Sequence, residues 1–235
     1  MSLLCLSLLL EVISRNPHVF SVSLQLNKHI MNDKVRQFVQ VGDSSTAMAY
    51  HSVGLNGSNV IVGIADTGVD EKSCYFSNPD NSFVKRSNIS KLVVDFTKRK
   101  VVQYVSFADS GDVVAGHGTH TSGTLAGFSE DNSGIHYGVA PEAKLAFYDV
   151  GSGNSDYLSI PPLDTYVFPA AVFAEANLHS NSWGGDINTY DTSCSESDSY
   201  LHANSNFLAF YAAGNSGPGA STITSPGFIL VYFYL

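Results

Sequence analysis

The sequence has little charge and few basic residues. Charged residues make up only 14% of the 235 positions, and 12 Lys and Arg stand against 21 Asp and Glu, which gives a formal net charge of -9. This balance repels a phosphate backbone, so we do not expect a nucleic acid as partner. Hydrophobic residues reach 44%, which excludes a disordered chain and suffices for one large domain with a sizeable core.

Cysteine is also scarce. The three cysteines, Cys5, Cys74 and Cys194, are too scattered for a zinc cluster and too few for a disulfide scaffold. Two interpretations stay open for the last two. They form a single bridge if the chain is secreted, or they are free, since cysteine is also a common buried residue.

The first ten residues are strongly apolar, as the hydrophobic region of a signal peptide is. No basic segment precedes them, no A-x-A-like cleavage site follows, and Glu11 and Arg15 come directly after. Ten residues are too few to span a bilayer. A signal peptide and the first element of a folded segment therefore both remain open, as does membrane association. We expect a secreted or extracytoplasmic location.

The pattern of apolar residues predicts an α/β fold. Alternation over residues 20–26 is typical of a half-buried strand, and residues 27–40 are interpreted as a connector or short helix. Later, small residues predict helices at 116–127 and 169–177, whereas the more polar stretch 87–111 is interpreted as an excursion from the core. Nearly continuous apolar runs, typical of strands buried on both faces of a parallel sheet, lie at 60–65, 144–150 and 207–213. Strands alternating with helices indicate a doubly wound, mostly parallel sheet with helices on both faces.

Three short motifs could carry chemistry, and the first is Asp66-Thr67-Gly68, directly after the apolar run 60–65. Sites in open α/β sheets form at the carboxyl ends of strands. A carboxylate placed there can orient an imidazole and stabilise its charged form. By itself, Asp-Thr-Gly after a strand is more often only a turn.

The second motif is Gly-His-Gly-Thr-His-Thr-Ser-Gly-Thr at residues 116–124. His117 would begin a helix, whose dipole disfavours the imidazolium form and leaves the ring available as a base. His117 and His120 are three residues apart and could bind a metal, but no third ligand stands nearby at a recognisable spacing. A hydrogen-bonded core histidine is a further alternative, which suits His120 better than His117.

The third motif is Ala-Ala-Gly-Asn-Ser-Gly at residues 212–217, again after an apolar run. The Asn215 amide can donate to an oxyanion, and Gly214 lets a substrate approach the backbone. Alone, an asparagine between glycines is usually a turn residue.

In this order, the motifs at 66–68, 117–120 and 213–215 resemble the successive signatures of subtilisin-like (peptidase S8) serine proteases. The segments at 138–141, 181–185 and 224–227 resemble further stretches of that family, so the resemblance covers about Asn59 to Gly227. Residues 26–42 show a weaker resemblance to the junction between prosegment and catalytic domain in one branch of the family, the branch that includes protease/ABC-transporter fusion proteins. We therefore divide the chain into an apolar start with a prosegment-like connector, 1–42, and a C-terminally incomplete peptidase domain, 43–235.

The resemblance implies a role for each matching residue. Asp66 would orient His117, His117 would act as general base and then acid, and Asn215 would donate to the oxyanion. The main chain of Ser182, Trp183 and Gly184 would bind an extended peptide or protein substrate as an added strand, beside Gly214. Trp183 would line the specificity pocket or, alternatively, be a buried core residue.

The resemblance implies no cofactor or metal for catalysis. Calcium is common in the family as a structural ion that clamps surface loops. The candidate carboxylates are Asp70, Asp109, Asp112, Asp186 and Asp198. None of them has the spacing of a calcium-binding loop, so no calcium site is assigned.

The family's nucleophile stands in a Gly-Thr-Ser-Met-Ala-type motif downstream of the oxyanion asparagine, and this sequence contains no such motif. Ser216, Ser221 and Ser225 lack that context. We therefore expect a chain of the serine endopeptidase family that is inactive as it stands. The alternatives are a non-catalytic peptide-binding remnant, or pseudoprotease, and, third, a metal-binding protein that uses His117 and His120.

Overall fold

The computed structural model describes residues 39–40, 48–112, 116–129, 137–153, 157–227 and 229. All of them belong to one compact unit, Asn32–Leu235. The apolar start, the strand predicted at 20–26, Cys5 and most of the predicted connector lie outside the described residues.

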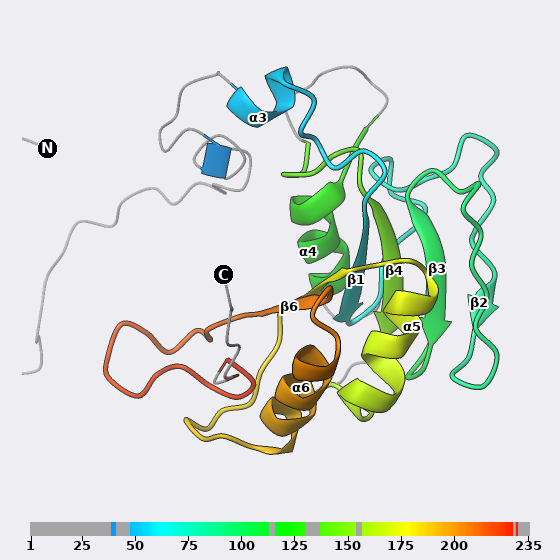
Figure 1. Cartoon of the computed structure of the whole chain (residues 1–235). Helices are drawn as coiled ribbons and strands as arrows, with labels where there is room; N and C mark the ends of the chain where they lie inside the picture. The colour runs from blue at the N-terminus through cyan, green and yellow to red at the C-terminus, as the bar shows by residue number, and fades with distance from the viewer. Residues whose placement is uncertain are drawn as a thin grey trace, which may run out of the picture. The chain divides into compact units, whose positions relative to one another are not determined.

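The described chain is built on a six-stranded sheet in the order β2-β3-β4-β1-β5-β6 (Figure 1). Its strands are β1 (Ile61–Asp66), β2 (Arg86–Ser87), β3 (Val101–Ser106), β4 (Lys144–Asp149), β5 (Leu178–Asn181) and β6 (Leu208–Tyr211). Neighbouring strands pair in parallel throughout this order. The chain first builds the β2–β4 side of β1 and then the β5–β6 side. The predicted doubly wound sheet is confirmed. Because all its strands are parallel, their carboxyl ends lie along the same edge of the sheet.

Helices cover both faces of this sheet (Figure 1). One face is covered by α4 (His117–Ala126), and the other by α5 (Phe168–Phe173), which follows the π-helical turn Leu163–Val167, and α6 (Thr192–Ala203). The short helix α3 (Ala49–Ser52) has no buried residue. Side chains alternate between the faces of β1, so that Val62 and Ile64 share a core cluster with Ala126 of α4. Ala65 shares the other cluster with Phe168 of α5 and with α6. None of the helices in the described ranges is long and apolar enough to cross a membrane.

The runs at 60–65 and 144–150 are confirmed as the buried strands β1 and β4, and the helix predicted at 116–127 as α4. The run at 207–213 contains the strand β6, but the prediction that it is buried on both faces is wrong, because Phe210 is exposed and, within β6, only Ala209 is buried. The interpretation of residues 87–111 as an excursion from the core is wrong for β3, which lies buried between β2 and β4. The segment looked polar in the sequence because of Lys100, Gln103 and Tyr104, although all three are buried. Lys100, just before β3, donates from Nζ to the carbonyl oxygens of Pro141 (2.8 Å) and Ala143 (2.6 Å). The helix predicted at 169–177 ends already at Phe173.

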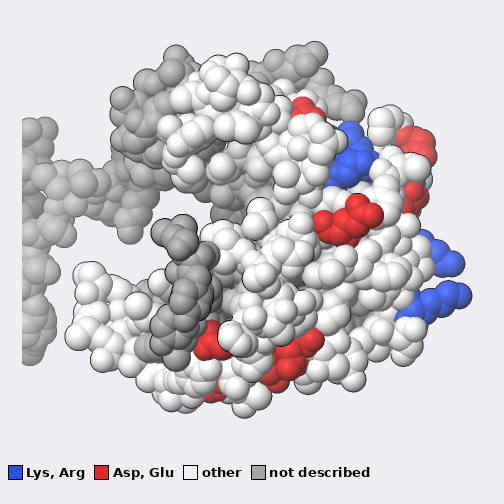
Figure 2. Space-filling view, in the orientation of Figure 1, with Lys and Arg blue, Asp and Glu red and all other residues white. Residues whose placement is uncertain are grey.

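The surface carries little charge on the face seen in Figure 2. Charged side chains lie there in separate small groups, and the basic ones do not form an extended patch. Large apolar side chains are exposed as well, among them Phe210 of β6, which is 55% exposed. That a nucleic acid is not a partner stays a prediction.

Candidate active site

The carboxyl group of Asp66 is held in a fixed orientation at the end of β1. Asp66 is only 1% exposed. Its Oδ1 accepts a hydrogen bond from the backbone N–H of Thr67 (2.7 Å) and lies 2.7 Å from His117 Nδ1. Its Oδ2 accepts from Thr121 Oγ1 (3.1 Å), one turn further along the helix that His117 begins. Both oxygens therefore have partners that keep one of them aimed at the imidazole.

His117 is the first residue of α4 and its side chain is half exposed. An imidazole that donates its Nδ1–H to a carboxylate presents Nε2 as a proton acceptor. In this orientation the ring can exchange protons through Nε2 with a molecule at the surface. The structure thus brings together the first two predicted site residues, which are 51 positions apart in the sequence.

The start of α4 is tied to the turn after β1 by a second carboxylate. Asp112 Oδ2 accepts from the backbone N–H of Thr119 (2.8 Å), and its Oδ1 accepts from Thr67 Oγ1 (2.9 Å). Thr67 Oγ1 in turn accepts from the backbone N–H of Gly118 (2.8 Å). Free N–H groups of a first helical turn are usually capped by the residue just before the helix. Here that residue is Gly116, and Asp112 and Thr67 replace its missing side chain.

A close approach of two backbones brings the imidazole within reach of Asp66. A Cβ atom on Gly118 would lie 2.1 Å from the carbonyl oxygen of Gly68, and Gly68 has φ = 127°, where glycine is favoured. The glycines of the two motifs are therefore required by the contact between them.

Ser182, Trp183 and Gly184 follow β5, the neighbour of β1. Trp183 Nε1 donates to the carbonyl oxygen of Ala65 (3.0 Å), one residue before Asp66. Its ring meets that of Tyr211 edge to face, with centroids 5.7 Å apart, and packs against the core cluster around α5. This packing favours the core role for Trp183, while its contribution to a specificity pocket stays a prediction.

Gly184 and Gly214 approach the same threonine. A Cβ atom on either glycine would lie 3.1 Å from Thr224 Oγ1, and Gly214 has φ = 105°. Asn215 comes next and is exposed. Among the described residues, Asn215 makes no hydrogen bond to Asp66 or His117, so its oxyanion role stays a prediction.

Two further predictions concern a metal site and a disulfide bond. The described part of the chain contains no group of three His, Cys, Asp or Glu side chains that could hold a metal ion, so the geometry there offers His117 and His120 no third ligand. The Cys74–Cys194 bridge is not formed: Cys74 is free and exposed, whereas Cys194 is free and buried.

Sequence reasoning missed Asp149, which is the partner of Asp66 in the pairing of β1 with β4. Its Oδ2 accepts a hydrogen bond from Tyr104 Oη (2.5 Å). Burial raises the pKa of Asp149 to about 8. Its position at the end of an apolar run, like that of Asp66, was a signal that could have found it.

Comparison with known proteins identifies the family of this chain. Residues 57–229 match the subtilase family, peptidase S8, and the chain belongs to this family of serine peptidases. It is 35% identical over 182 residues to the serine protease/ABC transporter B family protein tagD of Dictyostelium discoideum, a match that covers 73% of this chain and 10% of tagD. Against the subtilisin-like protease SBT4.14 of Arabidopsis thaliana it is 30% identical, over 71% of this chain and 25% of that protein.

Solved structures in the comparison are also proteases. The CspB protease of Clostridium perfringens superposes with a TM-score of 0.47 at 19% identity, over 71% of this chain and 38% of that one. The prenylagaramide maturation protease PagA gives 0.48 at 21% identity, over 73% and 52%. The chain spans about a tenth of the length of tagD and of its relative tagB.

Proposed function

We propose that this chain supplies the aspartate and histidine of a serine endopeptidase site. The observation that carries the proposal is the 2.7 Å contact between His117 Nδ1 and Asp66 Oδ1, in which a half-exposed imidazole is held by a buried carboxylate. In this role Asp66 orients the ring and stabilises its charged form. His117 takes the proton of a nucleophile through Nε2 and then delivers it to the leaving group. The proposed chemistry uses no metal or organic cofactor.

The topology supports a peptide as substrate. β1, β5 and β6 are adjacent, so Asp66, Ser182 and Asn215 follow the carboxyl ends of three neighbouring strands. Neighbouring strands are about 4.8 Å apart, so these residues follow strand ends on one narrow edge of the sheet. An extended peptide would add as a strand along Ser182, Trp183 and Gly184, with the Asn215 amide as donor to the oxyanion.

The proposal includes the absence of activity from these 235 residues on their own, because no serine among them stands in a Gly-Thr-Ser motif. In subtilisin, loss of the serine alone costs about 2 × 10⁶ in kcat, and the oxyanion hole and binding retain only about 10³–10⁴ over water.

The test is an assay of the purified chain with casein and with a serine-directed fluorophosphonate. We expect no turnover above a blank and no covalent labelling. Turnover that the fluorophosphonate blocks would show that a serine within the chain acts as nucleophile, and would overturn this part of the proposal.

A further inference from the structure

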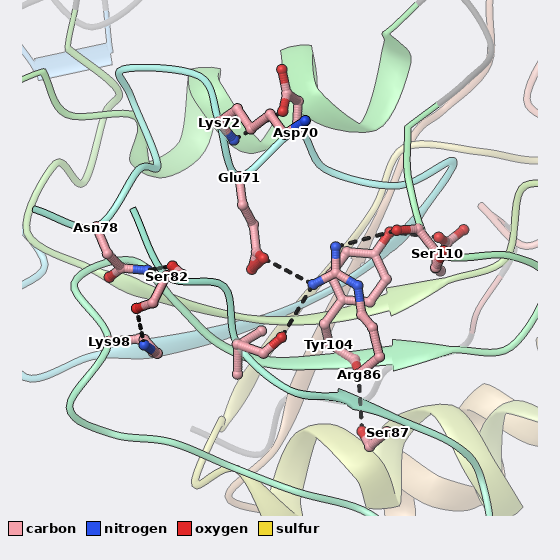
Figure 3. A network of polar contacts seen from close by, with 12 residues as sticks. Asp70, Glu71, Lys72, Asn78, Ser82, Arg86, Ser87, Lys98, Tyr104 and Ser110 are labelled. Atoms are coloured by element: carbon pink, nitrogen blue, oxygen red, sulfur yellow. Dashed lines mark hydrogen bonds and ion pairs between the residues drawn. The ribbon is translucent and has the colours of Figure 1, made fainter. Parts of the chain in front are cut away.

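The guanidinium group of Arg86 lies between two loops and contacts both (Figure 3). Its Nη1 donates to Glu71 Oε2 (2.8 Å), and its Nη2 donates to the carbonyl oxygen of Ser110 (3.2 Å). The same group lies over the ring of Tyr104, with its central carbon 3.6 Å from the ring centroid. Arg86 belongs to β2, outside the motifs that define the candidate site.

The two loops are those that carry the Asp66–His117 pair. Glu71 lies in the turn that follows Asp66 at the end of β1. Ser110 lies two residues before Asp112, whose carboxylate holds Thr67 and the first turn of α4. Arg86 therefore joins the segment that follows Asp66 to the segment that precedes His117, the same two segments that the contact between Asp66 and His117 joins.

We propose that Arg86 is a positioning residue for the Asp66–His117 pair, fixing the separation of the two loops that carry it. The proposal rests on the proposed function, in which this pair moves the proton. Arg86 itself touches neither Asp66 nor His117 and acts through Glu71, Ser110 and Asp112.

The chemistry of the contact requires an arginine. A planar guanidinium has donors on several edges, so it can serve Glu71 and Ser110 at once while one face stacks on Tyr104. A lysine carries one compact ammonium group, which has neither the flat face that stacks on Tyr104 nor the widely spaced donors that reach Glu71 and Ser110. Tyr104 is itself fixed, because its hydroxyl donates to Asp149, the strand partner of Asp66.

Glu71 makes the contact costly to break. Its side chain is only 3% exposed. Burial raises the pKa of Glu71, and the hydrogen bond and positive charge of Arg86 oppose that rise. Removing the arginine leaves a buried carboxylate without its cation, which either takes up a proton or draws water into the loop.

The test follows the imidazole proton that lies between His117 Nδ1 and Asp66 Oδ1 by proton NMR of the isotope-labelled 235-residue chain. His117→Gln identifies its resonance. In Arg86→Met we expect this proton to exchange with solvent about tenfold faster, the factor given by about 1.4 kcal/mol of lost interaction. Arg86→Lys restores the charge but not the bridge, so its exchange should be intermediate.

The matched control is Arg99→Met. The guanidinium group of Arg99 donates to three carbonyl oxygens, those of Ser77, Phe128 and Cys74, and none of these three residues is one that Arg86 holds. Its loss should leave the exchange rate of the His117 proton unchanged.

Unchanged exchange in Arg86→Met, or equal acceleration in Arg99→Met, would overturn the proposal. If circular dichroism shows that Arg86→Met does not fold, Arg86→Lys decides, and wild-type exchange in that variant also overturns it. Failure of the proposed function would appear separately, as a completed domain that keeps this resonance but whose activity does not depend on His117.

Discussion

Asp66 and Asp149 stand side by side in the register of β1 and β4, but their carboxyl groups are held by different partners. Asp66 contacts His117 through Oδ1 (2.7 Å), whereas Asp149 accepts from the Tyr104 hydroxyl (2.5 Å). Burial raises the pKa of Asp149 to about 8, so it keeps a proton to near neutral pH. One edge of the sheet thus carries a carboxylate in contact with an imidazole and a second carboxyl group whose pKa lies at about 8.

Asp149→Asn should change how stability depends on pH. The pKa of Asp149 in the folded chain lies near 8, above the ordinary 3.8, so the folded state holds more protons than the unfolded state between about pH 4 and pH 8. Its contribution to stability is therefore complete below about pH 4 and is lost as the pH rises through 8. Urea unfolding at pH 5 and pH 8 should show a fall in the wild type that is smaller in the variant. Parallel falls would contradict the assignment.

Lys100→Met should show the opposite dependence. Burial lowers the pKa of Lys100 from 10.5 to about 7, so the folded state holds fewer protons than the unfolded state between pH 7 and pH 10.5. Wild-type stability should rise with pH across this window because of Lys100, and the methionine variant should lack that part of the rise. Unfolding free energies at pH 7 and pH 9.5 measure the difference. An identical rise in both chains would contradict the lowered pKa of Lys100 in the folded state.

Gly118→Ala should destabilise the fold strongly, because its Cβ would lie 2.1 Å from the Gly68 carbonyl oxygen. We expect a loss of about 3 kcal/mol in the free energy of unfolding, at the upper end of the usual cost of overpacking. Gly123→Ala in the same helix is the control. Its Cβ would lie 3.9 Å from Phe76, so this change should stabilise by about 0.5–1 kcal/mol through helix propensity. Equal effects of the two changes would contradict the contact between α4 and the turn after β1.

Asp112→Ala should loosen the first turn of α4. It removes the acceptors of Thr67 Oγ1 and of the Thr119 N–H, two hydrogen bonds that each stabilise by about 1 kcal/mol, or about 2 kcal/mol together. Asp112→Asn keeps one acceptor oxygen and should lose less than half of this amount. Thermal and urea unfolding of the wild type and the two variants measure their stabilities, which should fall in the order wild type, Asp112→Asn, Asp112→Ala. An asparagine variant as unstable as the alanine variant would contradict this prediction.

The site residues that could be predicted from the sequence are those whose motif lies directly beside a strand or helix that the sequence also predicts. Asp66 and His117 each stand among small residues next to a predicted strand or helix, so motif and element point to the same place. β1 and β4 were found because buried parallel strands are continuous apolar runs. β3 was not, since Lys100, Gln103 and Tyr104 make its segment look polar, although all three are buried.

What the sequence could not reveal depends on contacts between distant residues. Arg86 reaches Glu71, 15 positions earlier, and the backbone carbonyl of Ser110, 24 positions later. A carbonyl acceptor leaves no mark in the sequence, because every residue has one. The pairing of Asp149 with Asp66 likewise follows from the strand order, which places β4 rather than β2 beside β1.

The most direct test of the central claim, that Asp66 and His117 are the acid–base pair of a subtilase site, uses a hybrid chain. Residues 1–227 are joined to the segment of tagD that follows the region matched to this chain, and hydrolysis of a peptide substrate is measured with and without His117→Ala. We predict turnover in the joined chain and a loss on the order of 10⁶ in kcat in the variant, as for the histidine of subtilisin. Turnover that survives His117→Ala would contradict the account.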